Sequence, residues 1–450
     1  CCQIIRQSEQ NWISVMAHQN LKNTYHRLTE RINLFPQGAP PSELLYGILR
    51  MLFSEREAGL VSQLPIRPFD VRKAASVWNM GEREAGGILD GLADRGILLD
   101  IEENGNRIYI MPPPMAGFFE FSLMRLRADL DQKALSELYY QYINVEEDFI
   151  KALFVAGETQ LGRALVQEPA LPSDSGIHVL DYERASHIIQ TATHIGIAMC
   201  YCRHKMGHVG RACEAPMDIC MTFNRAADSL IRHGIVRPVT VSECMGLLER
   251  AYENNLVQFG ENVQRQVSFI CNCCGCCCEA MIAARKFAHL HPVHTTNYLP
   301  SLDEGNCTGC GQCVSVCPIG AVALVSAADP RKRTKKKARV DEDACLGCGV
   351  CVRSCKAGAM TLTNRPERVI TPVDSARRLL LMALERDKLQ NLIFDTQALR
   401  SHRAMASILG AILKLPPMKR ALASSRLRSR YLDRLIDRYD EFHLAEHPGT

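Results

Sequence analysis

The sequence predicts an α+β protein of several domains. Helical periodicity alternates with strand and turn signals along its 450 residues, and 19 of its 21 cysteines lie between positions 200 and 355. We expect six segments. They are a helical N-terminal segment (1–38), a winged-helix-like module (39–117), a helical connector (118–180), a Cys-rich α/β domain (181–299), a domain of Cys- and Gly-rich turns (300–364), and a helical, basic C-terminal region (365–450).

The composition excludes several classes of protein. Apolar residues make up 47% of the chain and charged residues 23%, which is typical of a protein that buries sizeable cores. The net charge of +4 is too close to zero for a nucleic-acid binder overall. No stretch has the roughly 18 or more apolar residues of a membrane span, and no secretory leader is evident. Closely spaced thiols without a leader indicate a reducing compartment, so we expect a cytoplasmic protein and not a secreted disulfide scaffold.

Segment 39–117 has the order of elements found in a winged helix. Apolar residues at helical spacing predict a helix over Ser42–Glu57. Asp70 is the expected N-cap of a helix through Trp78, and a turn leads to another helix at Glu82–Asp94. The turn Glu-Glu-Asn-Gly-Asn then joins two strand-like runs, 97–101 and 107–111, into a hairpin.

The charge of the last of these helices argues against DNA as a partner. In a winged helix this element would enter the DNA groove, and here its four acidic residues outnumber Arg83 and Arg95. Phosphates would repel such a helix. We therefore expect the module to make protein contacts or to have a structural role, and we expect no DNA partner.

The segments that follow differ in their periodicity. A helical region is expected from Phe118 to about Val166, and helices then alternate with short apolar runs over 181–299. The cysteines of that domain are expected at strand-to-helix turns. Helical signals return from Pro372, with one helix from Asp374 to about Phe394 and another over 396–414.

One cysteine motif occurs twice in 300–364. Cys307-x2-Cys310-x2-Cys313-x3-Cys317-Pro318 is followed by a second run with the same internal spacing, and this pattern resembles bacterial-type ferredoxins with two [4Fe-4S] clusters. In that family the fourth cysteine of each run ligates the other cluster. The resemblance therefore implies that one cluster is held by Cys307, Cys310, Cys313 and Cys355, and the other by Cys345, Cys348, Cys351 and Cys317.

Two features depart from a minimal ferredoxin. Lys356 replaces the proline that usually follows the second run, which affects the turn and not the number of ligands. The insert at 328–340 carries seven basic residues, and it is either a solvated hairpin loop or a docking patch for an acidic redox partner. Two zinc sites, or clusters that only stabilise the fold, are the alternatives for the eight thiols.

Eleven further cysteines lie within 200–278. Cys244 stands alone on the apolar face of a helix and is expected to be buried as a small apolar residue. We expect others to form an additional iron–sulfur centre, which is one cubane, two clusters or an unusual centre with an open iron. Zinc, with His204 and His208 as further ligands, is the alternative. The candidate ligands are Cys200, Cys202, Cys213, Cys220, Cys271, Cys273 and Cys274.

The order of these features over about 40–360 also resembles a family of large iron–sulfur proteins of anaerobes that combine a winged helix with a ferredoxin domain. That resemblance implies redox work without naming a substrate. The chain lacks Gly-x-Gly-x-x-Gly after a strand and lacks a P-loop, so it offers no support for a nicotinamide, flavin-dinucleotide or nucleotide site.

Three functions remain. The first is an electron-transfer protein or subunit whose partners are ferredoxins, flavoproteins or oxidoreductase subunits. The second is an oxidoreductase that binds substrate at an open iron of the additional centre, and the third is a redox-sensing regulator. The basic amphipathic segment between Arg400 and Arg438 is either a helix packed on its own protein or a contact with an anionic membrane or an acidic subunit.

Overall fold

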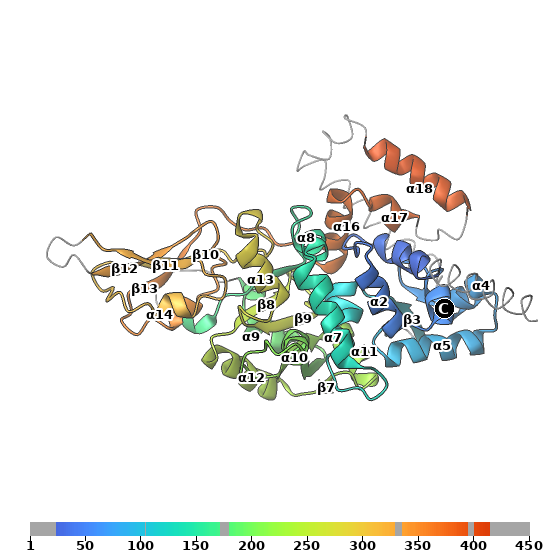
Figure 1. Cartoon of the computed structure of the whole chain (residues 1–450), viewed down its shortest axis with the longest axis horizontal. Helices are drawn as coiled ribbons and strands as arrows, with labels where there is room; N and C mark the ends of the chain where they lie inside the picture. The colour runs from blue at the N-terminus through green and yellow to red at the C-terminus, as the bar shows by residue number, and fades with distance from the viewer. Residues whose placement is uncertain (1–23, 104, 172–179, 329–334, 395–399, 415–450) are drawn as a thin grey trace, which may run out of the picture.

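The computed structural model describes residues 24–103, 105–171, 180–328, 335–394 and 400–414. Cys1, Cys2 and most of the basic C-terminal segment lie outside the described residues. The molecule is elongated, with the Cys- and Gly-rich domain at one end, the N-terminal module at the other and the Cys-rich domain between them (Figure 1). Within the described residues, no helix combines the length and apolarity needed to cross a bilayer.

The N-terminal module contains helices and a small three-stranded sheet in the order β1-β3-β2. The prediction of one helix over Ser42–Glu57 is wrong, because Phe53 has extended backbone angles and Ser54 begins a new helix through a capping box with Glu57. The prediction of Asp70 as an N-cap is confirmed, since its carboxylate accepts from the Lys73 amide. The elements are a helix at 24–33, α2 (Glu43–Leu52), α3 (Glu55–Val61), β1 (Phe69–Asp70), α4 (Val71–Trp78), α5 (Glu82–Asp94), β2 (Leu99–Glu103) and β3 (Asn106–Ile110).

The connector is less helical than expected. Its helices are short, and they pack through an aromatic cluster that includes Phe119, Tyr139 and Phe149. The expectation of helix up to about Val166 is wrong, because β4 (Gly162–Ala164) is a buried strand that pairs with the central sheet. The helices are α6 (Phe119–Phe121), α7 (Gln132–Tyr139) and α8 (Asp148–Phe154).

A six-stranded sheet forms the centre of the Cys-rich domain, in the order β4-β8-β9-β6-β5-β7. Every ladder within it is antiparallel. The expected α/β arrangement is therefore corrected to α+β for this domain, since parallel strands joined by crossover helices are absent from its described residues. Its other strands are β5 (Ile195–Met199), β6 (Asp218–Phe223), β7 (Arg237–Pro238), β8 (Val257–Glu261) and β9 (Phe269–Cys273).

Helices of the Cys-rich domain connect these strands and build a second core. Cys244 lies on α12 and is completely buried, as the sequence indicates, and burial raises the pKa of its thiol to about 12. The hydroxyl of Thr240 caps α12 by accepting from the Glu243 amide. The helices are α9 (Ala185–Thr191), α10 (Tyr201–His208), α11 (Asn224–Arg232), α12 (Val241–Glu253) and α13 (Glu279–Lys286).

Asp100 joins the N-terminal module to the central domain. Its side chain is buried on β2 and accepts hydrogen bonds from Ser229 and Arg232 on α11, at 2.7 and 2.5 Å. His233 lies 3.0 Å from the same carboxylate. Burial alone would raise the pKa of Asp100, but hydrogen bonds from His233 and Ser229 and the charge of Arg232 hold it well below its usual range.

The Cys- and Gly-rich domain has two similar halves. Each half contains one short helix, and the domain has two antiparallel two-stranded sheets, β10-β13 and β11-β12. The C-terminal helices follow and pack beside residues 34–35 of the N-terminal segment. The elements are β10 (Tyr298–Leu302), α14 (Gln312–Ser315), β11 (Val322–Ser326), β12 (Lys336–Val340), α15 (Val350–Arg353), β13 (Met360–Asn364), α16 (Ser375–Glu385), α17 (Leu389–Ile393) and α18 (Arg400–Leu413).

Candidate metal centres

The eight thiols of the repeated motif gather around two small cavities. Each cavity takes three cysteines from one run and the fourth from the other, which are the quartets that the ferredoxin resemblance implies. We call them the first quartet (Cys307, Cys310, Cys313, Cys355) and the second quartet (Cys345, Cys348, Cys351, Cys317).

Glycines shape both of these sites in the same way. Gly311 and Gly349 have φ values of +81° and +84° and stand at the N-terminal caps of α14 and α15. Gly347 also has positive φ, and its amide lies 3.4 Å from the Cys345 sulfur. Left-handed backbone is accessible to glycine without strain, and it turns amide N–H groups toward the thiolates. Such donors favour the anionic ligands that an iron–sulfur cluster requires.

The two quartets differ in exposure. Cys310 of the first quartet is exposed, and hydrogen bonding to the Gln312 amide lowers the pKa of its thiol. In the second quartet, burial raises the pKa of Cys345 to about 11 and that of Cys348 to about 12. Four neighbouring thiolates are unfavourable at such a site unless a metal centre compensates their charge. The donor set and its burial therefore fit a bound cluster.

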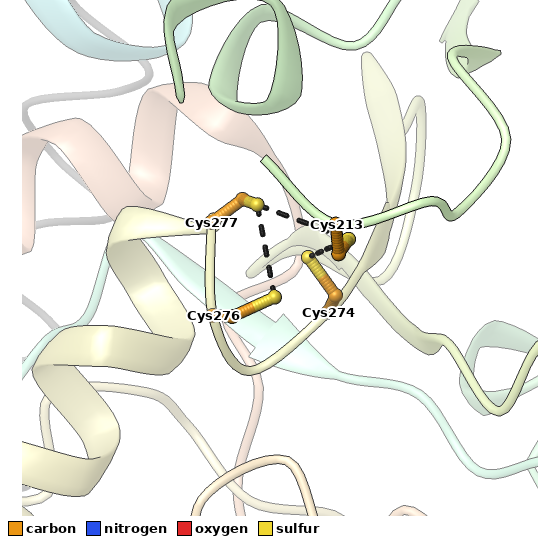
Figure 2. Close-up of side chains that lie close together, drawn as sticks. All are labelled: Cys213, Cys274, Cys276 and Cys277. Atoms are coloured by element: carbon orange, nitrogen blue, oxygen red, sulfur yellow. Dashed lines mark hydrogen bonds between the residues drawn. The ribbon is translucent and has the colours of Figure 1, made fainter. Parts of the chain in front are cut away.

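Four cysteines of the Cys-rich domain form a tight group at one side of it (Figure 2). Cys213 comes from the loop after α10, and the other three come from the loop between β9 and α13. Neighbouring sulfur atoms lie 3.5 to 3.8 Å apart, and all four lie within 4.8 Å of one another. We call this set the loop quartet (Cys213, Cys274, Cys276, Cys277).

Six other cysteines line a cavity of about 300 Å³ beneath the sheet. Cys271 and Cys273 alternate with Asn272 on β9, so their side chains share the face that the cavity occupies. Cys220 on β6 lies opposite, with its sulfur 4.0 Å from that of Cys271. We call these the cavity cysteines (Cys200, Cys202, Cys220, Cys271, Cys273, Cys278), and Cys274 of the loop quartet also reaches this cavity.

Two helix N-termini face the cavity. Cys200 is the N-cap of α10, and Cys278 is the N-cap of α13. The neighbouring Cys202 thiol lowers the pKa of both thiols, and backbone amides of the first helical turn act in the same direction. These two positions therefore favour the thiolate form, which is the form that binds metal.

Charged groups are buried beside the cavity cysteines. Arg203 is fully buried and donates to the carbonyl oxygens of Pro216 and Asn272. Burial acts to lower the pKa of Arg203, but the neighbouring thiolates of Cys200 and Cys274 outweigh it and raise that pKa. Glu279 pairs with the buried Lys205 at 2.5 Å and accepts from the Cys202 thiol at 2.6 Å.

The cavity also contains polar atoms without partners and a protonatable carboxyl. The Tyr201 hydroxyl and Arg203 Nε are buried and have no hydrogen-bond partner. Glu120 lines the cavity, and burial, followed by the charge of Glu279, raises its pKa to about 8. Unpaired buried polar atoms are rare in native proteins and commonly mark a site that a bound group completes.

The seven thiols predicted for one additional centre thus fall into two places. Six of them line the cavity, whereas Cys213 does not; Cys213 and Cys274 belong to the loop quartet, so Cys274 takes part in both places. Sequence reasoning omitted Cys276, Cys277 and Cys278. His204 and His208 face each other at 3.1 Å, and neither is part of the loop quartet.

The Cys-rich domain contacts the segment that follows Cys317 of the second quartet. Arg285 on α13 donates to the carbonyl oxygens of Gly275 and Pro318, at 2.5 and 2.9 Å. Pro318 follows Cys317 in the chain, and Gly275 lies within the loop that carries Cys274 and Cys276. A single arginine therefore joins the loop quartet to the second quartet.

Comparison with known proteins identifies one part of the chain. Residues 306–359 match the 4Fe-4S dicluster domain family, and this match contains both cysteine runs. No curated protein matches the chain. The chain therefore carries an iron–sulfur dicluster segment, and its second set of cysteines lies outside the matched residues.

Proposed function

We propose that the protein transfers electrons between a partner protein and an additional iron–sulfur centre held by the cavity cysteines, by way of the dicluster domain. The observation that carries this proposal is the contact between Gly275 and Pro318 through Arg285. Through this contact, the first quartet, the second quartet and the cavity cysteines lie in series along the molecule. A [4Fe-4S] cluster, when bound, supplies a one-electron carrier at each ferredoxin quartet.

Packing supports an order among these groups. Ile319, Leu346 and Val350 beside the second quartet belong to the same apolar core as Cys273 and Cys278. Residues around the first quartet, including Met360, are not in that core; they belong to a smaller one, which Cys351 of the second quartet shares. The second quartet is therefore the inner one, and the first quartet, with its exposed Cys310, is the outer one that faces a partner.

The outer quartet also has a basic neighbour. Gly309, which precedes Cys310 of that quartet, packs against the carbonyl of Lys336 on β12, and Lys336 and Arg339 of this strand are exposed. Basic side chains around an electron-transfer site favour a partner with an acidic surface, because opposite charges speed encounter and fix orientation. A ferredoxin, a flavoprotein or an acidic oxidoreductase subunit has the required chemistry.

A second candidate function follows from the cavity itself. A cavity of about 300 Å³ with mostly apolar walls, seven thiols and the carboxyl of Glu120 has the composition of a small-molecule site. An oxidoreductase would bind its substrate at an iron of the cavity centre that lacks a protein thiolate. Glu120, with its raised pKa, would hold the proton that such a reaction needs.

The test uses the full chain purified without oxygen. We expect more than about 8 iron atoms per chain, with acid-labile sulfide, since two cubanes account for 8. Cys200→Ser should remove an EPR signal additional to those of the dicluster domain, and Cys244→Ser, which replaces a buried thiol elsewhere, should not. Reduction by a ferredoxin or flavoprotein should reach the additional centre. A colourless protein that contains zinc and no sulfide contradicts the proposal. An EPR spectrum of Cys200→Ser identical to that of the unsubstituted protein contradicts it as well.

A further inference from the structure

The loop quartet differs from every other thiol group in its spacing. Among the described residues, it is the one group of three or more metal-ligating side chains whose ligand atoms all lie within 4.8 Å of one another. The sulfur atoms of the two ferredoxin quartets and those of the cavity cysteines do not form such a group. The spacing of the sulfur atoms therefore separates the loop quartet from the other thiol groups of the same molecule.

The distances in the loop quartet correspond to a single ion. A tetrahedral ion bound to thiolates at about 2.3 Å places neighbouring sulfurs about 3.8 Å apart. The pairs Cys213–Cys274, Cys276–Cys277 and Cys277–Cys213 lie at 3.5, 3.7 and 3.8 Å. In a cubane each cysteine binds a different iron, so ligand sulfurs stand roughly 6 Å apart.

The chain is built to bring these thiols together. Residues 274–277 turn sharply between β9 and α13, and the turn passes so close to Pro318 that only glycine fits at position 275. Cys276 and Cys277 are adjacent in sequence, yet their sulfurs point into the same space (Figure 2). Cys277 is fully buried and Cys276 is exposed, so the site lies at the surface of the domain with an open side.

We propose that Cys213, Cys274, Cys276 and Cys277 bind one thiophilic divalent ion, Zn²⁺ or Fe²⁺, as a tetrathiolate site separate from the cavity centre. Binding forms four metal–sulfur bonds, and each coordinating sulfur that still carries a proton releases it, without any change of oxidation state. The site has a charge of −2, which the nearby guanidinium of Arg203 offsets in part.

The ion would fix the loop on which two other features depend. Cys278, a cavity thiol, follows the quartet directly, and Gly275 within it touches the dicluster domain. A tetrathiolate site here holds both in place whether or not the ion itself changes oxidation state. The proposal does not depend on electron transfer through the protein.

Metal analysis of the full chain tests this site. We chose Cys213→Ser and Cys276→Ser because neither residue lines the cavity, and Cys244→Ser is the matched control. Each of the two variants should lose about one metal equivalent per chain, with sulfide and the remaining iron unchanged. If the ion is zinc, the zinc content falls. If it is iron, the signal of an isolated high-spin ferric ion in oxidised protein disappears.

A second measurement does not depend on folding of the variants. The original protein loaded with Co²⁺ should show the visible ligand-field bands of a tetrahedral tetrathiolate cobalt site. Loss of several irons together with sulfide in Cys276→Ser overturns the proposal, because it means that the quartet ligates a cluster. Unchanged metal content in both variants, or the absence of tetrahedral cobalt bands, overturns it as well.

Discussion

Replacing Gly275 by alanine tests the contact between the Cys-rich domain and the dicluster domain. A Cβ atom at this position would lie 2.1 Å from the carbonyl oxygen of Pro318 and 2.7 Å from the Arg285 guanidinium. Non-bonded heavy atoms are in contact at about 3.5 Å, so the two loops must separate by more than about 1 Å. The obstacle at Pro318 is backbone, which cannot rotate away as a flexible side chain does.

This overlap destabilises the folded protein. Overpacking of this kind typically lowers the free energy of unfolding by about 1–3 kcal/mol. In the full-length, metal-loaded protein we expect faster amide hydrogen exchange at 274–278 and 317–321, because the hydrogen bonds of Arg285 lose their geometry. Rapid-mixing reduction should show the dicluster domain reduced at its original rate and the cavity centre reduced more slowly, because the route between them is longer.

Gly246→Ala provides the matched control. Gly246 lies in α12, and nothing stands within 4 Å of the position of its Cβ. Alanine should leave reduction unchanged there and stabilise the helix by up to about 1 kcal/mol. If Gly275→Ala keeps the original hydrogen exchange in both loops and the original reduction rates, the inferred connection between the two domains is wrong.

Three further predictions concern other parts of the molecule. In Gly347→Ala a Cβ would lie 2.1 Å from the Tyr298 carbonyl at a φ of +70°, so we expect loss of about half of the dicluster iron by metal analysis. The pKa of His233 is raised, chiefly by its hydrogen bond to Asp100, so its contribution to stability is complete below about pH 6.5 and is lost as the pH rises through the raised value. The pKa of Asp100 is lowered, so its contribution to stability is present above about pH 4 and is lost as the pH falls. In thermal unfolding, the stabilisation by the Asp100–His233 pair should therefore be largest between about pH 4 and about pH 6.5. Lys336→Glu should slow reduction by an acidic partner protein, with the difference shrinking as salt is added.

Each of these predictions has its own control. Gly358→Ala shares the positive φ in open space and should keep its iron. Asp100→Asn should flatten the dependence on pH, and a curve unchanged from the original would contradict the assignment. Arg83→Glu reverses a charge on the distant α5, so an effect equal to that of Lys336→Glu would show that overall charge, and not the basic strand, controls the reduction rate.

The dicluster segment was the part of the fold most open to sequence reasoning. Three ligands of each quartet lie within seven residues of one another, so spacing alone brings them to one site. The exchange of Cys317 and Cys355 between quartets came from the family resemblance, and the cavities group these two residues accordingly. The break in the first predicted helix also had a local signal, because Ser54 and Glu57 have the spacing of a capping box.

The division of the second cysteine set had no such local signal. Which thiols share the cavity depends on the register between β6 and β9, which pairs Met221 with Ile270 and so brings Cys220 near Cys271. A strand over 269–273 would have predicted that Cys271 and Cys273 share a face. The partnership of Cys213 with a loop 61 residues later in the chain depends on tertiary structure alone.

The order of the thiol groups helps to distinguish an electron carrier from an enzyme that binds a small molecule in the cavity. Cys310 is exposed, whereas the thiols of the second quartet and the cavity cysteines are buried or half-buried, and the latter face the cavity. The cavity is also lined by the apolar side chains of Met111, Met115 and Phe121. A carrier between two proteins needs exposed thiol groups at both ends of its route, whereas an inner end that is a mostly apolar cavity suits a small molecule that reacts there. Small ligands of iron, such as cyanide, should then alter the EPR signal of the cavity centre and leave the dicluster signals unchanged, and identical spectra with and without the ligand would favour the carrier.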